Sequence, residues 1–314
     1  MFYNCENFFN VTHDTLKIDD QFLPNGDHHW TWGKYNQKVK NIAKVITAVG
    51  GWTPPDIVGL CEVENRYCLE SLTKFSPLEK LNYQIIHKES PDRRGIDVAL
   101  LYQEKTFTPI STHFIQIDFS FDKDKKTRDI LYVSGYTNKK DTLHIFVNHW
   151  PSRWGGQLES EQNRMFVASV LKNTVDSIFE KNKNANIVIM GDLNDEPDNK
   201  SVLETLKANS TFDNIKSNEL YNLSYYLQFE KNICSHKYQG HWANLDQLIV
   251  SGNLLLKKQK LSTSLNDAHI FKVNFLLEKD DSYFGVKPFR TYIGFKYHGG
   301  FSDHLPVYLD LQRK

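Results

Sequence analysis

The chain has 314 residues, enough for one large domain or two ordinary ones. Its 38 lysines and arginines balance 38 aspartates and glutamates, which argues against a protein that coats duplex DNA with a broad basic face but allows a local basic cleft. No stretch has the roughly 20 apolar residues of a membrane span, and no basic-then-apolar leader opens the chain. We therefore expect no stable membrane insertion.

Short apolar segments typical of β-strands recur along the whole chain. After an opening segment at Met1–Tyr3, the clearest are Ile57–Leu60, Ile96–Tyr102, Phe114–Ile117, Ile130–Val133, Leu143–Val147, Ile187–Met190, Leu245–Val250 and Val307–Leu311. Several are apolar at successive positions, as strands are when other layers cover both faces of their sheet.

Helical periods fall between these segments. Tyr35–Val49 places apolar residues three and four apart and ends at two glycines, and Glu161–Phe179 has the same spacing. Ser201–Leu206 is a shorter predicted helix that Asp198 could cap, whereas Ser262–Phe289 has no clear period and is expected to be irregular. Buried strands alternating with helices predict an α/β layered fold with sheets inside and helices outside.

The four cysteines show no CxxC spacing, which argues against zinc-knuckle and redox motifs. They are expected to be buried thiols. A bridge between Cys5 and Cys61, which both lie in strand-like segments, is the one pairing that the sequence suggests.

The segment Gly191-Asp192-Leu193-Asn194-Asp195 follows the apolar run Asn186–Met190. Residues two apart lie on the same side of an extended chain, so Asp192 and Asn194 would project a carboxylate and an amide into one cleft. Magnesium prefers oxygen ligands of this kind and keeps several waters. A polar turn before Pro197 explains the same residues equally well.

Two more polar residues accompany strand-like segments in the first part of the chain. Glu62 follows Ile57–Cys61, and a carboxylate at the carboxyl end of a buried strand is well placed to bind a metal ion. Asn4 lies inside the apolar opening segment. A surface strand end and a hydrogen-bonded turn residue are the respective alternatives.

His149 follows the run Leu143–Asn148, and Ser152 and Arg153 come shortly after it. A hydroxyl and a guanidinium close to an imidazole form a group that can bind phosphate. Taken singly, His149 could be structural and Arg153 a solvated loop charge.

Asp246 lies inside the apolar run Leu245–Val250, where an unpaired carboxylate would be costly to bury. His304 is a candidate partner, because a carboxylate fixes the tautomer of an imidazole and raises its basicity. A structural lysine or arginine would satisfy Asp246 equally well. Asp303 points away from His304 in a regular strand, so it would reach a metal ion or an attacking water only if the chain bends there.

Five strand ends thus present the residue types that one phosphate-cleaving site needs. Their order resembles that of the endonuclease/exonuclease/phosphatase superfamily, the group of DNase I and exonuclease III, and most closely its uncharacterised Bacteroidetes-type members. The segments that carry the resemblance are Phe2-Tyr3-Asn4-Cys5-Glu6-Asn7, Leu60-Cys61-Glu62-Val63, Asn148-His149-Trp150-Pro151-Ser152, Gly191-Asp192-Leu193-Asn194, Leu245-Asp246-Gln247 and Ser302-Asp303-His304-Leu305-Pro306-Val307.

The resemblance implies a four-layered α/β sandwich of the DNase I type, in which two mixed β-sheets pack face to face with helices outside. Residues 1–314 would form a single catalytic domain. The resemblance also implies that Mg²⁺ or Mn²⁺ is the cofactor, with Glu62 as its principal ligand, assisted by Asn4 and Asp303.

The same resemblance implies roles for the remaining site residues. Asp192 and Asn194 would orient or activate the attacking water. His149 would donate a hydrogen bond to a phosphate oxygen, and His304, held by Asp246, would bind the phosphate or act as the acid/base.

Three further residues are candidates from their position alone. Arg94 and Arg128 are candidate phosphate contacts, like Arg153, and the alternative for each is a solvated turn. Asp97 is a candidate carboxylate partner for His149.

We therefore expect a divalent-metal-dependent hydrolase of phosphate esters, most simply a phosphodiesterase or nuclease. A phosphomonoesterase or phospholipase-C-like enzyme acting on sugar, inositol or lipid phosphates is the alternative on the same scaffold, and a catalytically silent binding module is the non-enzymatic one.

The expected partner is a phosphate-ester substrate, with nucleic acid as a candidate; no obligate protein partner is expected. The sequence does not distinguish a cytoplasmic from an exported bacterial protein. Four tryptophans are candidates for a binding rim: Trp30, Trp32, Trp154 and Trp242.

Overall fold

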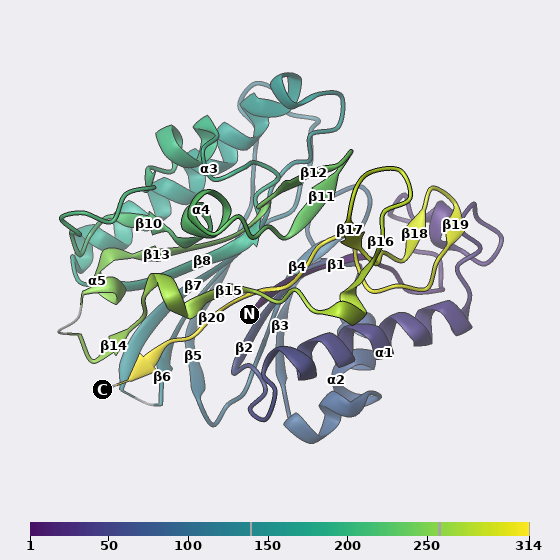
Figure 1. Cartoon of the computed structure of the whole chain (residues 1–314), viewed down its shortest axis with the longest axis horizontal. Helices are drawn as coiled ribbons and strands as arrows, with labels where there is room; N and C mark the ends of the chain where they lie inside the picture. Colours follow the sequence, from purple (N-terminus) through teal and green to yellow (C-terminus); the bar gives the residue numbers. More distant parts are fainter. Residues whose placement is uncertain (139, 257–258, 314) are drawn as a thin grey trace.

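The computed structural model describes residues 1–138, 140–256 and 259–313. Two mixed β-sheets pack face to face, with α1 (Trp32–Val49) and α2 (Arg66–Lys74) on one outer side and α3 (Gln157–Lys181) on the other (Figure 1). This order of layers, helix, sheet, sheet and helix, confirms the predicted fold class.

The first sheet has six strands. In spatial order they are β15 (Ala268–Ile270), β20 (Val307–Leu309), β1 (Phe2–Phe8), β2 (Ile57–Val63), β4 (Asp97–Tyr102) and β3 (Gln84–His87). β1 and β2 run parallel, and the other neighbours are antiparallel. The carboxyl ends of β1 and β2 therefore lie together at one edge of the sheet.

The second sheet has seven strands. In spatial order they are β5 (Phe107–Ile115), β6 (Ile130–Thr137), β7 (Asp141–His149), β8 (Asn186–Asp192), β13 (Asp246–Ser251), β10 (Leu220–Asn222) and β9 (Ala208–Asn209). β7 and β8 run parallel, so these strands also end together.

Four further sheets have two strands each. They pair β11 (His236–Tyr238) with β12 (His241–Ala243), β14 (Leu261–Ser262) with β21 (Gln312–Arg313), β16 (Leu277–Lys279) with β17 (Val286–Pro288), and β18 (Tyr292–Ile293) with β19 (Lys296–Tyr297). Two further helices, α4 (Leu223–Tyr225) and α5 (Gly252–Leu255), are each about one turn long. Short 3₁₀ or π turns lie at Asp20–Phe22, Pro77–Leu81, Ser201–Thr205, Tyr226–Glu230, Leu265–Asp267 and Asn274–Leu276.

Successive apolar side chains of a strand point to opposite faces of its sheet, and together they form three layers of core. Val188 and Met190 of β8 point to the space between the sheets, whereas Ile187 and Ile189 point to the core beneath α3. A third core lies between the first sheet and α1 and includes Ile42. Burying both faces of the strands in this way explains their continuous apolar runs.

The predicted elements differ from the structure in detail. α1 and α3 begin three and four residues earlier than Tyr35 and Glu161. The predicted helix at Ser201 forms only a π turn, with no capping hydrogen bond from a side chain. The stretch Ser262–Phe289, predicted to be irregular, contains short strands, and β15 extends the first sheet.

Cys5 and Cys61 do not form a bridge, and all four cysteines are free and buried. The two side chains face opposite sides of the first sheet, Cys5 toward α1 and Cys61 toward the second sheet. A disulfide between them is therefore excluded by the pleat of the strands. None of the helices in the described ranges is long and apolar enough to cross a membrane.

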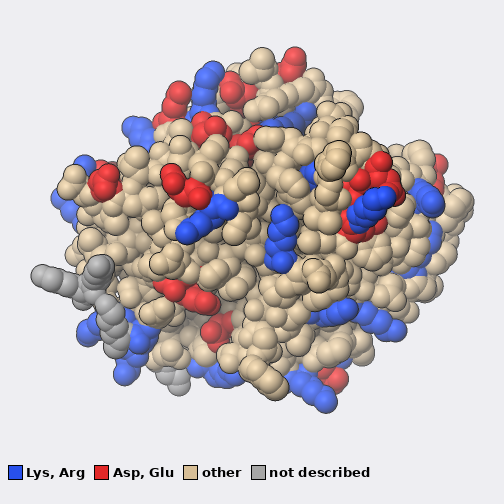
Figure 2. Space-filling view, in the orientation of Figure 1, with Lys and Arg blue, Asp and Glu red and all other residues tan. Residues whose placement is uncertain are grey.

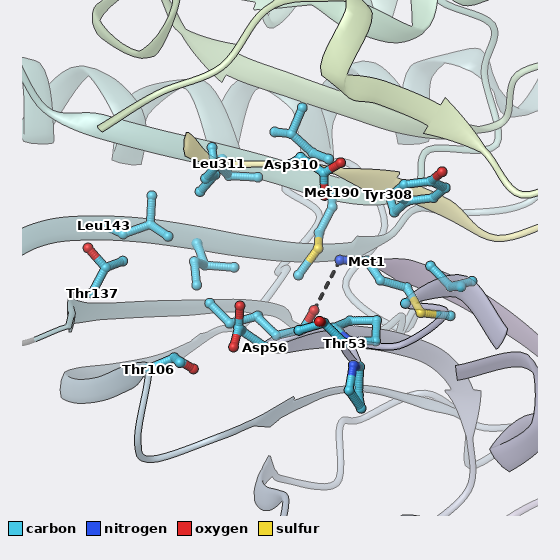
Figure 3. Close-up of a pocket in the computed structure, with 18 of the residues that line it drawn as sticks. Met1, Thr53, Asp56, Thr106, Thr137, Leu143, Met190, Tyr308, Asp310 and Leu311 are labelled. Atoms are coloured by element: carbon cyan, nitrogen blue, oxygen red, sulfur yellow. Dashed lines mark hydrogen bonds between the residues drawn. The ribbon is translucent and has the colours of Figure 1, made fainter. Parts of the chain in front are cut away.

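A cavity of about 500 Å³ lies between the two sheets (Figure 3). Met1, Leu143 and Met190 line it, and the Met1 amino group donates a hydrogen bond to the Ile57 carbonyl at 3.0 Å. Met1 and Ile57 lie where β1 and β2 begin. The cavity is therefore at the opposite end of these strands from the polar residues that follow Cys61.

Charged side chains are dispersed over the molecular face shown in Figure 2. Lysines and arginines alternate with aspartates and glutamates, and much of this face is uncharged. The view agrees with the balanced composition of the chain and contains no broad basic patch.

Candidate active site

Three of the predicted site residues lie side by side across the second sheet. Asp192, at the end of β8, is in register with His149, at the end of β7, and with Asp246, at the start of β13. Parallel β7 and β8 end together, and antiparallel β13 begins where β8 ends. The strand pairing alone therefore brings two carboxylates and one imidazole to the same level.

Asp192 is the centre of the site. Its Oδ2 atom accepts a hydrogen bond from Asn4 Nδ2 at 3.0 Å and lies 3.8 Å from the Nε2 atoms of both His149 and His304. Its Oδ1 atom accepts the backbone N–H of Asn194 at 2.9 Å. Burial raises the pKa of the Asp192 carboxyl to about 6, which makes it a group that can exchange a proton near neutrality.

His304 and Asp246 form the predicted pair. His304 Nδ1 lies 2.7 Å from Asp246 Oδ2, which also accepts the Ser235 hydroxyl at 2.6 Å. Burial disfavours a charged imidazole, but Asp246 and Asp192 outweigh it and hold the pKa of His304 well above its ordinary range. The two acids therefore favour the charged form of His304, which presents Nε2 to Asp192.

His149 is buried, and its Nε2 atom lies 3.9 Å from Glu62 Oε1. Burial, reinforced by nearby arginines, lowers the pKa of His149 well below its ordinary range, so this imidazole is neutral. Asp97 is not its partner, contrary to the prediction, because the Asp97 carboxylate lies against His87 Nε2 at 3.1 Å. His149 Nδ1 has no hydrogen-bond partner among the described residues.

Bulges at the ends of β1 and β2 aim Glu62 at this group. The register shifts between Cys61 and Val63, and Glu62 has a φ of 58°. Glu62 Oε2 accepts the backbone N–H of Asn7 at 2.7 Å, and Asn7 itself has a φ of 56°. Left-handed conformations at non-glycine residues cost energy and cluster at functional sites.

Gly191 is required by the close approach of β7 and β8 beside Asp192. A Cβ atom at this position would lie 2.4 Å from the carbonyl oxygen of Asn148. The glycine of the Gly191-Asp192 segment thus lets the two strands stay paired up to the level of the site.

Two of the arginines that the sequence suggests as phosphate contacts hold the backbone of site segments. Arg128 is buried and donates to the carbonyls of His149 and Trp150, at 3.2 and 2.5 Å. Arg153 donates through Nε to the Asn194 carbonyl at 2.8 Å. The arginine N–H groups that donate to these carbonyls cannot at the same time donate to a substrate.

Of the other candidates for the rim of the site, some are exposed and one is buried. Arg94 is exposed and donates to Asn7 Oδ1 at 2.8 Å, and Ser152 is exposed. Trp154, in the loop that follows His149, is 91% exposed. Trp30, in contrast, is fully buried in the core beneath α1 and cannot contribute to a binding rim.

Sequence reasoning missed three residues that surround the pair at His304. Arg290 donates to Asp303 Oδ2 at 2.9 Å and to Glu6 Oε1 at 3.1 Å. The ring of His236 lies 4.5 Å from that of His304. Glu6 belongs to a segment that carries the family resemblance and so left a signal, whereas Arg290 and His236 lie in stretches without one.

The donor groups at the site fit a hard divalent cation, because they are mainly carboxylate and amide oxygens. In the described part of the chain, two groups of ligand atoms share His304, one with His236 and Asp303 and the other with Asp192 and Asp246. Within each group the ligand atoms lie within 4.8 Å of one another. Glu62 belongs to neither group.

Known structures share this fold. The human Nocturnin catalytic domain with bound sulfate anion is 20% identical, with a TM-score of 0.56 over 90% of this chain and 88% of that chain. TDP2 from D. rerio, complexed with single strand DNA product, is 13% identical, with a TM-score of 0.56 over 91% and 95%. An endonuclease/exonuclease/phosphatase family protein from Bacteroides thetaiotaomicron is 14% identical, with a TM-score of 0.56 over 99% and 92%.

No curated protein matches the chain in sequence. The model of the endonuclease/exonuclease/phosphatase family matches residues 1–313. With the four-layered sandwich and the order of the site segments along it, this match shows that the chain belongs to the endonuclease/exonuclease/phosphatase family.

Proposed function

We propose that the chain is a divalent-metal-dependent phosphodiesterase that cleaves nucleic acid, with residues 1–314 acting as a single catalytic domain. The observation that supports this most directly is the position of Asp192 Oδ2, which lies 3.8 Å from two imidazole nitrogens, one neutral and one charged. A phosphate ester bound there would meet a proton acceptor and two N–H donors.

The two imidazoles take different roles in this proposal. His149 is neutral and donates through Nε2–H to a non-bridging phosphate oxygen. His304 is held in the charged form by Asp246 and stabilises the negative charge that develops on the phosphate. The surroundings of the two rings support these roles, because His149 is buried near Arg128 whereas His304 is paired with the Asp246 carboxylate.

Asp192 positions the attacking water and takes its proton at Oδ2. The raised pKa of its carboxyl, about 6, suits a general base that works near neutrality. Asn194 assists, because its backbone N–H holds Asp192 Oδ1 and its side chain donates to the Trp150 carbonyl at 3.0 Å. The direction of the carboxylate is thereby restricted.

Glu62 is the proposed principal ligand of Mg²⁺ or Mn²⁺, with Asn4 on the neighbouring strand and Asp303 as assisting groups. A bound cation of this kind neutralises phosphate oxygens and the charge that develops on the leaving group. The chain's own contribution is the orientation of these oxygens, since Asn7 N–H fixes Glu62 and Asp192 fixes the Asn4 amide.

Two observations favour nucleic acid as the substrate. The exposed indole of Trp154 lies two residues after the Asn148–Ser152 segment and offers a surface on which a base can stack. The structurally similar TDP2 from D. rerio was determined with a single strand DNA product. The absence of excess positive charge on this chain favours single strands or chain ends over long duplexes.

A substrate panel tests the proposal. The purified chain is assayed with Mg²⁺ and with Mn²⁺ on single-stranded DNA, duplex DNA, RNA, sphingomyelin, inositol phosphates and 4-nitrophenyl phosphate. Metal-dependent cleavage of DNA or RNA that exceeds hydrolysis of the monoester is the expected result. Preference for the monoesters or the lipid would reassign the substrate, and no hydrolysis by a folded chain would contradict the enzymatic function.

A further inference from the structure

Residues 274–301, here called the hairpin segment, leave the sandwich after β15 and return at Ser302. They contain the paired strands β16–β17 and β18–β19 (Figure 1). The segment is fixed to α1, because the buried ammonium of Lys38 donates to Thr291 Oγ1 at 2.5 Å and to the Phe301 carbonyl at 2.7 Å. These two hydrogen bonds attach the hairpin segment to α1.

Arg290 extends from the hairpin segment between two acids that belong to the sandwich. Its Nε atom donates to Glu6 Oε1 at 3.1 Å, and its Nη2 atom donates to Asp303 Oδ2 at 2.9 Å. Glu6 is buried and also accepts the backbone N–H of Thr291 at 2.6 Å. One edge of the guanidinium is thus anchored on a fixed carboxylate, and the other holds Asp303.

The held carboxylate lies beside the His304 imidazole of the site. Asp303 Oδ1 is 4.0 Å from His304 Nε2, the same nitrogen that faces Asp192 at 3.8 Å. Neighbouring residues of a regular strand point to opposite sides, so Asp303 and His304 face each other only because the chain bends at Ser302–Pro306, outside any strand. Among the described residues, the group that donates a hydrogen bond to the Asp303 carboxylate in that bend is Arg290.

We propose that Arg290 is a positioning residue, through which the hairpin segment holds the Asp303 carboxylate beside His304 Nε2. The inference rests on the proposed hydrolase function and deepens it. The inference rests on one guanidinium that binds Glu6 through Nε and Asp303 through Nη2. A lysine cannot reproduce this bridge in full, because its ammonium is a single point of charge.

The alternative is that Arg290 only stabilises the hairpin segment. A double-mutant cycle separates the two, because residues that act through each other are not additive. The four proteins are wild type, Arg290→Gln, Asp303→Asn and the double variant, assayed as the full chain with Mn²⁺ on bis(4-nitrophenyl) phosphate. Arg290→Lys and Lys287→Gln complete the set.

Arg290→Gln is expected to lower kcat by about 10- to 100-fold, the usual effect of removing a group that orients a site ligand, with KM nearly unchanged. In the Asp303→Asn background the same substitution should lower kcat by less than about twofold. Arg290→Lys should recover part of the rate. Equal losses in both backgrounds, or a lower melting temperature without a loss of kcat, would overturn the inference.

Lys287→Gln is the matched control, since it removes one positive charge from the same segment and breaks only the pair with Glu278 at 3.8 Å. It should leave kcat and KM at wild-type values. If Arg290→Gln does not fold, the cycle is run with Arg290→Lys, for which the same non-additivity is expected at smaller amplitude.

A readout without turnover separates this inference from the function on which it rests. The imidazole resonances of His304 in NMR should shift on Arg290→Gln in the wild-type background and not in the Asp303→Asn background. That coupling in a chain that hydrolyses nothing would support the positioning and overturn the proposed function. Hydrolysis by the wild type with no coupling in either readout would overturn the positioning alone.

Discussion

His304 and Asp246 form a buried pair in which Nδ1 of the imidazole lies 2.7 Å from Oδ2 of the carboxylate. The two residues are 58 positions apart in the chain. Asp246 is held in turn by the Ser235 hydroxyl at 2.6 Å. The pair therefore has one orientation, with the second nitrogen of His304 directed to Asp192 at 3.8 Å.

Removing either member of this pair should reduce hydrolysis. His304→Ala is expected to lower kcat by about 10² or more, as the loss of a positioned acid/base group does, and Asp246→Asn should also lower it because the imidazole loses the carboxylate that favours its charged form and fixes its orientation. The measurement is kcat for the preferred substrate at saturating metal ion, with melting temperatures to confirm folding. Wild-type rates in both variants would remove His304 from the mechanism.

Removal of the metal ion should abolish hydrolysis without unfolding the chain. Chelation by EDTA is expected to stop the reaction, and Mg²⁺ or Mn²⁺ should restore it. Glu62→Gln should raise the metal concentration for half-maximal rate by about tenfold or more, because the site loses a charged ligand. Glu70→Gln on α2 is the control and should titrate like the wild type. Full activity in EDTA would contradict the metal dependence.

Arg128 and Arg94 should behave differently, although the sequence suggested the same role for both. Arg128→Ala leaves the buried Asp92 carboxylate, 3.1 Å away in the wild type, without its partner, so the free energy of unfolding should fall by about 3–5 kcal/mol. Arg94→Ala, at an exposed side chain, should change that free energy by less than about 0.5 kcal/mol and raise KM. Urea unfolding and steady-state kinetics measure both. A stable Arg128→Ala variant with only a raised KM would return that arginine to the substrate.

Trp154 should contribute to the binding of single strands. Trp154→Ala is expected to weaken binding of a single-stranded oligonucleotide by about 1–3 kcal/mol, the range for loss of one stacked base. Binding is measured by fluorescence anisotropy in the Asp192→Asn background, so that cleavage does not interfere. Trp52→Ala, at another exposed tryptophan in the loop before β2, serves as the control. Equal effects of the two substitutions would exclude a specific stacking role.

The layers of the fold could be predicted because periodicity is a local property. The continuous apolar run at Ile187–Met190 requires cover on both faces, and the period at Tyr35–Val49 marks a helix with one apolar side. Their exact ends could not be predicted in the same way. α3 begins at Gln157, after two glycines whose left-handed φ values, 85° and 125°, turn the chain into the helix.

A carboxylate in an apolar strand requires a partner, so the sequence could offer His304 as one candidate for Asp246 beside a lysine or arginine, and the fold shows that the partner is His304. The function of each arginine could not be predicted, since a guanidinium donates equally well to a phosphate or to a carbonyl, and only the fold shows that Arg128 reaches the carbonyl of His149. Arg290 was out of reach for a further reason. Arg290 follows a stretch of sequence without a clear period, and its partner Glu6 is 284 positions away in the chain.

Asp192 lies at the centre of the site that we propose for metal-dependent phosphodiester hydrolysis. The most direct test is the rate at which the wild-type chain and Asp192→Asn cleave a labelled single-stranded oligonucleotide with Mn²⁺. We expect cleavage by the wild type and a rate lower by about 10² or more in a folded Asp192→Asn variant. A folded wild-type chain that cleaves no phosphodiester, or an Asp192→Asn variant with the wild-type rate, would contradict it.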